Sequence, residues 1–378
     1  MFELVQFAAP QSTDEHFMTA ALSLAQLGRG EVEPNPVVGA VIVRGGREIA
    51  RGWHRRFGGP HAEIEALRAA ADEGVNVHGA TMYVTLEPCC HHGKTPPCTE
   101  TILEAGIARV VAAMADPDEN VAGGGIAKLR AAGVQVDVGV CEDAARTLLA
   151  PYRKLREQRR PWVICKWAQT ADGYLALPAE YGRFISGPDS RAAVHELRAF
   201  CDGILVGAGT LLSDDPMLTN RAGTGKQPTR VVLDSRLRTP LTCRVVTTAG
   251  ETPTIIATTL AGVRGNRTAA AALRDAGVEL LDLPAGEEGI SIPALLDELG
   301  RRQWTYLLVE GGSRVLSSFI LPGLADELWA FVANDPAPDE AAGEPTFNIA
   351  DLAERLSLPT PQEIPFRDDL LLRYVLRA

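Results

Sequence analysis

The feature that most constrains the fold of this chain is a set of three potential metal ligands that lie far apart in the sequence. His61 is followed two positions later by Glu63, and the cysteines Cys89 and Cys98 come further along the chain. For one ion to bind His61, Cys89 and Cys98 together, the fold must bring three separate segments to a single point.

The hydrophobic periodicity around the ligands predicts that each lies at the end of an element. A helix is expected at 61–72, a strand at 80–86 and a second helix at 98–105, with Pro97 placing Cys98 in the first helical turn. A capping sequence at 12–15 begins an earlier helix. Further strands are expected at 37–43, 49–54 and 109–114, and a basic helix runs towards Arg160 until Pro161 ends it.

The chemistry of the ligands points to zinc. One imidazole and two thiolates suit this ion, and three protein ligands leave a fourth position for water, which is typical of a catalytic site. Glu63, at the start of a helix, can take the proton of that water and pass it to a leaving amine. Two alternatives remain open at this stage: a structural zinc with His91 or His92 as fourth ligand, and Cys90 as a competitor of Cys89.

The alternation of strands and helices restarts after Pro161, which predicts two α/β domains, 1–157 and 158–378. No Gly-x-Gly-x-x-Gly follows a strand, so an ordinary dinucleotide fingerprint is missing. Glycine-containing turns are expected at 206–210 and 309–313. Each is either a phosphate-binding turn or a tight turn without a ligand. The strands expected in this half are 162–167, 203–206, 230–234, 254–257, 278–283, 305–310, 327–332 and 370–376, with helices at 190–200 and 292–299 and a loop at 334–345.

The charge and hydropathy of the chain argue against a nucleic-acid-binding, secreted or membrane-spanning protein. The net charge of −11 disfavours a binder of long nucleic acids, which usually carries a basic face. The N-terminus does not look like a signal peptide, and no stretch reaches the roughly 20 apolar residues that span a bilayer. The sequence predicts a cytoplasmic enzyme that acts on a small molecule and binds neither nucleic acid nor membrane; a homo-oligomer is left open.

The metal-ligand pattern resembles the cytidine-deaminase superfamily, whose signature is His-x-Glu followed by Pro-Cys-x-x-Cys. Here eight residues rather than two separate the cysteines, and this longer segment, 85–98, together with 34–39 and 52–54, resembles the bifunctional diaminohydroxyphosphoribosylaminopyrimidine deaminases/5-amino-6-(5-phosphoribosylamino)uracil reductases of riboflavin biosynthesis. The resemblance implies attack of zinc-bound hydroxide on C2 of 2,5-diamino-6-(5-phosphoribosylamino)pyrimidin-4-one, with release of ammonia. It also implies substrate contacts, which are Asn35, His54, His91 and Lys94.

The resemblance continues into the second half through 166–173, 199–221, 232–235 and 309–312. It implies a cytidine-deaminase-like three-layer domain followed by a dihydrofolate-reductase-like domain, in which NADPH delivers hydride to the ribose C1′. The implied cofactor positions are Ala168, Phe184, Thr210, Asp214, Ser235, Gly312 and Ser313, within a turn at 312–318. The implied substrate positions are Gly182, Arg198, Leu218, Arg221 and Glu310, with the two arginines as clamps for the ribose phosphate.

The chain departs from the family pattern at three places. Gly182 stands where the family has a hydroxyl residue, Phe184 stands for Trp, and an apolar-basic stretch is missing after Val332. These departures keep a second hypothesis open, a monofunctional deaminase with a degenerate or repurposed C-terminal domain. The remaining alternatives are a deaminase that edits nucleic acids and a protein without enzymatic activity in which zinc only stabilises the fold.

Overall fold

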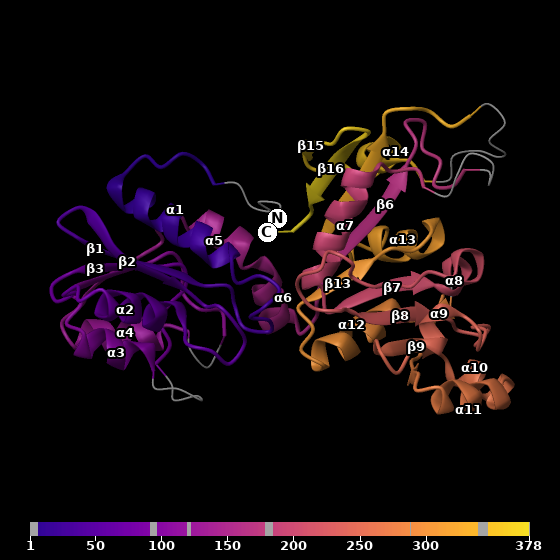
Figure 1. The fold of residues 1–378 in the computed structure, drawn as a ribbon, viewed down its shortest axis with the longest axis horizontal. Helices are drawn as coiled ribbons and strands as arrows, with labels where there is room; N and C mark the ends of the chain where they lie inside the picture. The colour runs from indigo at the N-terminus through magenta and orange to yellow at the C-terminus, as the bar shows by residue number, and fades with distance from the viewer. Residues whose placement is uncertain are drawn as a thin grey trace. The chain divides into compact units, whose positions relative to one another are not determined.

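Two units, each built around its own sheet, make up the chain (Figure 1). The computed structural model describes residues 7–90, 97–118, 122–177, 184–287, 289–338 and 347–377. The N-terminal unit runs up to Arg159, and the C-terminal unit comprises Arg160–Arg377. Within these described ranges, no helix is long and apolar enough to cross a membrane.

The N-terminal unit is a three-layer α/β/α arrangement. Its mixed sheet has the strand order β2-β1-β3-β4-β5, in which β1 is antiparallel to β2 and β3 while β3, β4 and β5 are parallel. The strands are β1 (Gly39–Arg44), β2 (Arg47–Trp53), β3 (Thr81–Val84), β4 (Arg109–Ala112) and β5 (Gln135–Val138). Helices α1 (Thr13–Gln26) and α5 (Glu142–Leu148) lie on one face, and α2 (Ala62–Asp72), α3 (Cys98–Glu104) and α4 (Gly124–Ala131) lie on the other (Figure 1).

Local sequence explains where these helices begin and end. Ser12 accepts the backbone N–H of Glu15, which confirms the predicted cap of α1. The basic helix is α6 (Ala150–Gln158), and Arg159 follows it in a left-handed conformation with φ of 55°. The helix thus stops before Pro161, as the sequence predicts.

Two glycines set how closely the helices approach the sheet. A Cβ on Gly39 would lie 2.0 Å from the carbonyl oxygen of Ala21 in α1, and a Cβ on Gly52 would lie 2.3 Å from the backbone nitrogen of Ala66 in α2. Only glycine fits such contacts with backbone atoms. The start of α2 is thereby held directly against β2, which fixes the position of the residues just before the helix.

The C-terminal unit contains a nine-stranded sheet with the order β10-β9-β8-β7-β13-β6-β14-β16-β15. The first seven strands in this order are parallel, and β16 and β15 are antiparallel to their neighbours. These strands are β6 (Trp162–Gln169), β7 (Gly203–Gly207), β8 (Thr229–Leu233), β9 (Thr254–Thr258), β10 (Glu279–Asp282), β13 (Tyr306–Val309), β14 (Glu327–Ala333), β15 (Gln362–Pro365) and β16 (Asp369–Val375). A small hairpin joins β11 (Ala285–Gly286) to β12 (Gly289–Ile290).

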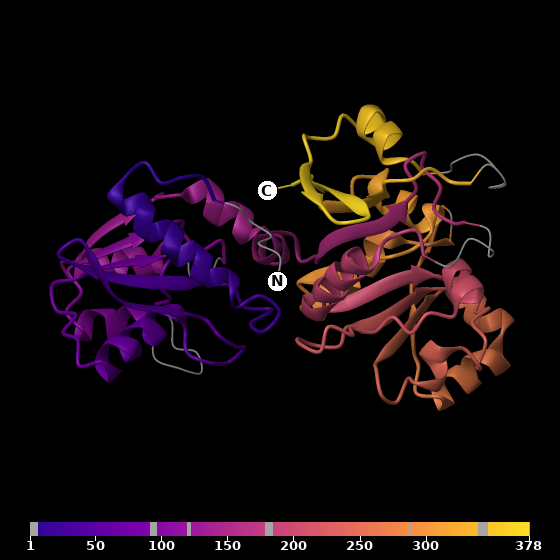
Figure 2. The ribbon, with the colours of Figure 1, turned by 45° about the horizontal axis from the view of Figure 1, so that its top comes forward.

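Helices cover this sheet, and one apolar core packs α12, α13 and α14 against the strands. The helices are α7 (Pro188–Phe200), α8 (Ala208–Asp214), α9 (Arg244–Thr247), α10 (Leu260–Gly265), α11 (Arg267–Asp275), α12 (Ile292–Arg301), α13 (Ser313–Ile320) and α14 (Ile349–Leu356). Helix α14 lies beside β15 and β16 in both views (Figures 1 and 2). In a parallel sheet the carboxyl ends of the strands meet at one edge, so the residues after β6, β7, β8 and β13 gather there.

Candidate functional site

His61 is positioned by the strand-to-helix connection between β2 and α2. It is the residue immediately before α2 and has extended backbone angles (φ −73°, ψ 164°). The ring of His54, at the end of β2, contacts the ring of His61 edge to face, with centroids 5.5 Å apart. Because Gly52 holds α2 against β2, the imidazole of His61 is fixed at the edge of the sheet.

Cys89 follows β3, in a segment whose position is fixed by hydrogen bonds to a buried carboxylate. Glu87, two residues earlier, is only 4% exposed. Its Oε1 accepts the N–H groups of Gly125 (2.9 Å) and Ile126 (3.0 Å), and its Oε2 accepts those of Gly123 (2.9 Å) and Asp116 (3.2 Å). Glu87 therefore ties the segment of Cys89 to the start of α4.

Cys98 is the first residue of α3, as the sequence predicts. Its backbone N–H points to the Sγ of Cys89 at 3.3 Å, and the N–H of Thr99 donates to the carbonyl of Cys89 at 3.2 Å. The orphan N–H groups of the helix start thus bind both the thiol and the backbone of Cys89.

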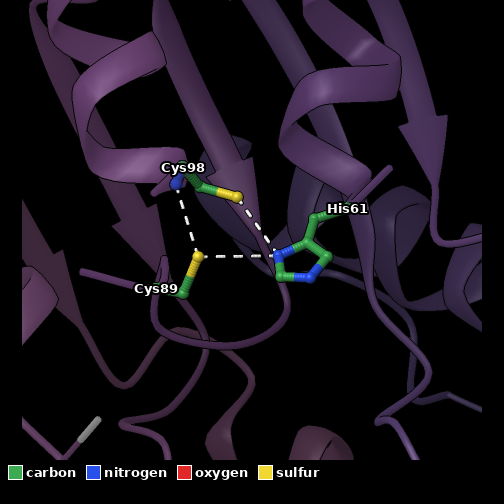
Figure 3. A group of neighbouring side chains, drawn as sticks. All are labelled: His61, Cys89 and Cys98. Carbon is green, nitrogen blue, oxygen red and sulfur yellow. Dashed lines mark hydrogen bonds between the residues drawn. The ribbon is translucent and has the colours of Figure 1, made fainter. Parts of the chain in front are cut away.

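The three predicted ligands converge (Figure 3). The Nδ1 of His61 lies 3.6 Å from the Sγ of Cys89 and 3.3 Å from the Sγ of Cys98, and all three donor atoms lie within 4.8 Å of one another. One nitrogen and two sulfur donors at this spacing fit a zinc ion and leave room for a further ligand.

The three side chains of this group shift one another's pKa values. The hydrogen bond with the Cys98 side chain lowers the pKa of Cys89 to about 4, against the opposing effect of burial. The hydrogen bond to Cys89 raises the pKa of His61 to about 9, and the same thiol raises the pKa of Cys98. Cys89 is therefore the more acidic of the two thiols, and the thiolate is the form that binds a metal.

Glu63 lies in the first turn of α2 and is only 3% exposed. Burial raises the pKa of its carboxyl, although the nearby charge of His61 opposes this shift. A buried carboxyl with a raised pKa beside a metal group can both accept and donate a proton near neutral pH.

Cys90 is not part of the ligand group within the described residues. It is half-buried, and a Cβ on Gly124 would lie 2.9 Å from its Sγ, so its thiol is directed at the start of α4. The two histidines considered as a fourth ligand, His91 and His92, lie outside the described residues.

Two of the predicted substrate residues lie beside the metal group. The Nδ2 of Asn35 is 3.2 Å from the Nε2 of His54, and the Nδ1 of His54 is 2.8 Å from the carbonyl oxygen of Pro60. In this arrangement Nδ1 of His54 carries the proton and donates to Pro60, so that Nε2 accepts from Asn35. The Oδ1 of Asn35 is thereby left as the acceptor for another group. Lys94 lies outside the described residues.

In the C-terminal unit, two predicted substrate residues bond to each other. The Nε and Nη2 of Arg198 donate to the carboxylate of Glu310 at 2.8 and 2.6 Å, and Nη1 donates to the carbonyl of Thr219 at 3.1 Å. Both side chains of this pair are largely buried. Leu218 is buried and adopts a left-handed φ of 51°, a strained conformation of the kind that occurs at functional sites.

Four of the predicted cofactor residues line one cavity of about 1220 Å³ at the carboxyl edge of the sheet. They are Thr210, Ser235, Gly312 and Ser313, and the turn that begins at Gly312 opens α13. Its lining also includes the residues Arg236, Arg238 and Arg314. A cavity of this size with cationic side chains suits a ligand that carries several phosphates.

The remaining predicted residues lie elsewhere within the described part of the chain. Ala168 is on β6 opposite Phe331 of β14, Asp214 ends α8, and the exposed ring of Phe184 packs under the guanidinium of Arg191. None of Ala168, Phe184 and Asp214 is among the described residues that line the cavity. Gly182 lies outside the described residues.

Sequence reasoning missed two residues that the structure places at these sites. Glu87 lies two residues before the metal ligand Cys89, and this short distance was the only feature of the sequence that could have indicated its role. His195 lies one turn before Arg198 on α7, a spacing that puts both on one face of the helix, and it contacts Arg221.

Comparisons with known proteins match two regions of the chain. The cytidine and deoxycytidylate deaminase zinc-binding region matches residues 11–114, and the RibD C-terminal domain matches residues 161–334. The riboflavin biosynthesis protein RibD of Aquifex aeolicus is 43% identical over 321 residues, which cover 85% of this chain and 86% of that protein. RibD of Escherichia coli is 37% identical and covers 87% and 90%, respectively.

Solved structures show the same similarity. The Thermotoga maritima diaminohydroxyphosphoribosylaminopyrimidine deaminase/5-amino-6-(5-phosphoribosylamino)uracil reductase matches with a TM-score of 0.81 and 35% identity, over 96% of this chain and 99% of that one. Acinetobacter baumannii RibD matches with a TM-score of 0.81 and 32% identity, over 97% and 99%. The predicted fold class, a cytidine-deaminase-like domain followed by a dihydrofolate-reductase-like domain, is confirmed.

Proposed function

Because the chain belongs to the RibD family of riboflavin-biosynthesis deaminases/reductases, we propose that it deaminates a pyrimidine at its zinc group and then reduces the product with NADPH. The chain is a riboflavin-biosynthesis deaminase and reductase with a zinc-binding deaminase region.

The first reaction is the deamination of 2,5-diamino-6-(5-phosphoribosylamino)pyrimidin-4-one at C2. The observation that carries this assignment is the buried carboxyl of Glu63 beside the convergent His61, Cys89 and Cys98. A zinc ion held by these three residues would supply the Lewis acidity that makes water nucleophilic near neutral pH. Glu63 takes a proton from the attacking water and delivers it to the departing amine, so that ammonia leaves and a carbonyl remains at C2.

Asn35 orients the pyrimidine in this reaction. Its amide NH₂ is engaged by His54, so its Oδ1 is directed to an N–H group of the base. We also assign Lys94 to the substrate because of its place in the family motif.

A substitution of Glu63 tests the deaminase mechanism. Glu63→Gln keeps the shape of the side chain but cannot take the proton, so we expect stoichiometric zinc and a loss of ammonia release of roughly 10²- to 10⁴-fold. Glu73→Gln, at the exposed end of the same helix, is the matched control and should behave like the wild type. Full ammonia release by Glu63→Gln would refute the mechanism.

The second reaction is reduction of the ribosyl group to a ribityl chain. NADPH would lie in the cavity lined by Thr210, Ser235, Gly312 and Ser313, with its phosphates near the arginines of the lining. When bound, NADPH would supply a hydride to C1′ of the ribose; the bond from C1′ to the ring oxygen would break, and that oxygen would take a proton to become a hydroxyl group. We place Ala168, Phe184 and Asp214 at the same cofactor, and Gly182, Leu218 and Glu310 at the substrate.

NADPH binding tests the reductase assignment in the full-length protein. Titration of NADPH, followed by its fluorescence, should show saturable binding, and NADPH oxidation should require the deaminated substrate. A replacement of Gly312 by Trp, which fills the cavity, should abolish binding while ammonia release continues. Unchanged binding in that variant would move the cofactor to another site.

A further inference from the structure

The imidazole of His195 and the side chain of Arg221 form a contact that no assigned role explains. The backbone N–H of Arg221 lies 3.2 Å from Nδ1 of His195, and the Nε and Nη2 atoms of Arg221 lie 3.2 and 3.0 Å from Nε2 of His195. Both ring nitrogens of one histidine therefore face donors of one arginine.

This contact cannot be fully satisfied. A neutral imidazole has one N–H and one acceptor nitrogen, so it accepts either the backbone N–H at Nδ1 or the guanidinium at Nε2, but not both. Protonation of His195 would remove both acceptors. Burial, reinforced by the charges of Arg198 and Arg221, lowers the pKa of His195 to about 4; Glu310 opposes this shift and Lys166 adds to it. His195 is therefore neutral near pH 7. Its protonated ring nitrogen then faces an N–H group of Arg221, so that two donors point at each other.

Arg221 is also the better placed of the two predicted phosphate clamps. The guanidinium of Arg198 is buried in its pair with Glu310, whereas Arg221 is exposed. The backbone next to Arg221 is held firmly, because the N–H of Asn220 donates to Gln227 at 2.9 Å and the amide of Asn220 donates to the carbonyl of Thr224 at 2.6 Å. The loop thus presents Arg221 at a fixed position beside α7.

We propose that His195 is a substrate-binding residue: together with Arg221 it binds the phosphate of the reductase substrate. A phosphate oxygen supplies the acceptor that the free protein lacks. Nδ1 of His195 then accepts the backbone N–H of Arg221, Nε2–H donates to the phosphate, and the guanidinium donates to a second phosphate oxygen. Arg198 serves instead as the positioning residue of Glu310. This proposal deepens the reductase assignment made above and rests on it.

Two substitutions of His195 separate phosphate binding from packing. His195→Leu removes the donor, whereas His195→Gln carries an amide that can donate from near the position of Nε2. Calorimetric titration of the full-length protein with ribose 5-phosphate should show binding to the wild type, a roughly 10- to 100-fold weaker Kd for His195→Leu, and a Kd close to that of the wild type for His195→Gln. Arg221→Gln should weaken binding at least as much.

Kinetics with two substrates give a readout that a structural role would not produce. For the phosphorylated substrate, His195→Leu should raise KM by the same factor and leave kcat within about 2-fold. For the dephosphorylated substrate, His195→Leu and the wild type should be equal, because there is no phosphate to bind. NADPH titration confirms that each variant is folded, and His16→Leu, on the exposed face of α1, is the control for loss of a helical histidine.

Three results would overturn the proposal. These are no binding of ribose 5-phosphate to the wild type, equal binding to the wild type and His195→Leu, and equal losses for His195→Leu with both substrates. If the wild type binds ribose 5-phosphate but does not oxidise NADPH with the deaminated substrate, the reductase assignment fails. The titration still decides whether His195 and Arg221 bind phosphate.

Discussion

The carboxylate of Glu87 makes a quantitative prediction about the stability of the N-terminal unit. In Glu87→Gln, the amide oxygen can replace one carboxylate oxygen and accept two of the four N–H groups. The amide NH₂ then faces the other two, either Gly123 and Asp116 or Gly125 and Ile126. A buried donor without an acceptor costs about 1–3 kcal/mol, so the two together cost about 2–6 kcal/mol.

Scanning calorimetry of the full-length protein measures this effect. For a domain of this size, each kcal/mol shifts the transition by about 2–4 °C, so Glu87→Gln should lower the transition of the N-terminal unit by roughly 4–24 °C. NADPH identifies the other transition, because a ligand raises only the melting temperature of the unit that binds it. The transition of the C-terminal unit should not move.

The control for this experiment is Glu100→Gln. Glu100 forms an exposed ion pair with Lys128 at 2.9 Å, and loss of such a pair costs at most about 1 kcal/mol. The reasoning is wrong if Glu87→Gln melts no lower than Glu100→Gln. It is also wrong if zinc affinity is unchanged in Glu87→Gln, since loss of support behind a ligand usually weakens metal binding by about 10- to 100-fold.

Three further predictions concern other parts of the chain. Cys98→Ser should lose stoichiometric zinc in a colorimetric metal assay, whereas Cys90→Ser should retain it, because only Cys98 belongs to the ligand group. Asp14→Asn should lose about 1 kcal/mol or less near pH 7 and progressively less in acid. The hydrogen bond from Arg109 lowers the pKa of Asp14, so the stabilising effect of this carboxylate is present above its unfolded pKa and disappears as the pH falls through the lowered, folded pKa. Melting curves at neutral and acidic pH measure this difference. Arg236→Ala should raise the KM for NADPH several-fold and leave that for NADH unchanged in steady-state kinetics, if this arginine of the cavity lining binds the 2′-phosphate.

The sequence predicted the metal group because the required information is local. The residue types of His61, Cys89 and Cys98 indicate zinc, and glycine, proline and periodicity place each of them at the end of an element. Most strands of both sheets are also predictable for this reason, since a buried strand is an apolar run whatever its neighbours are. The missed elements differ: β15 contains Pro365 and alternates exposed polar residues, which is tolerated only at the edge of a sheet.

Hydrogen bonds between polar groups that lie far apart in the sequence could not be predicted. Glu87 finds its partners in a segment that begins almost thirty residues later, and Arg198 finds Glu310 across 112 positions. Nothing in the local pattern distinguishes an arginine that binds a phosphate from one that neutralises a buried carboxylate. The contact of His195 with Arg221 is of the same kind, because it depends on how the loop after α8 folds back on α7.

The two bonds that join Cys98 and Thr99 to Cys89 have a consequence for how such enzymes can diversify. They clamp the ends of the segment 90–97, so the spacing of the two sulfur ligands does not depend on what the chain does between them. Evolution, or a protein engineer, can therefore exchange this stretch without rebuilding the metal centre. A chimera in which a short Gly/Ser linker replaces 91–96 should still bind one zinc ion. If Lys94 contacts the substrate, as proposed above, the KM of this chimera for the phosphorylated pyrimidine should rise.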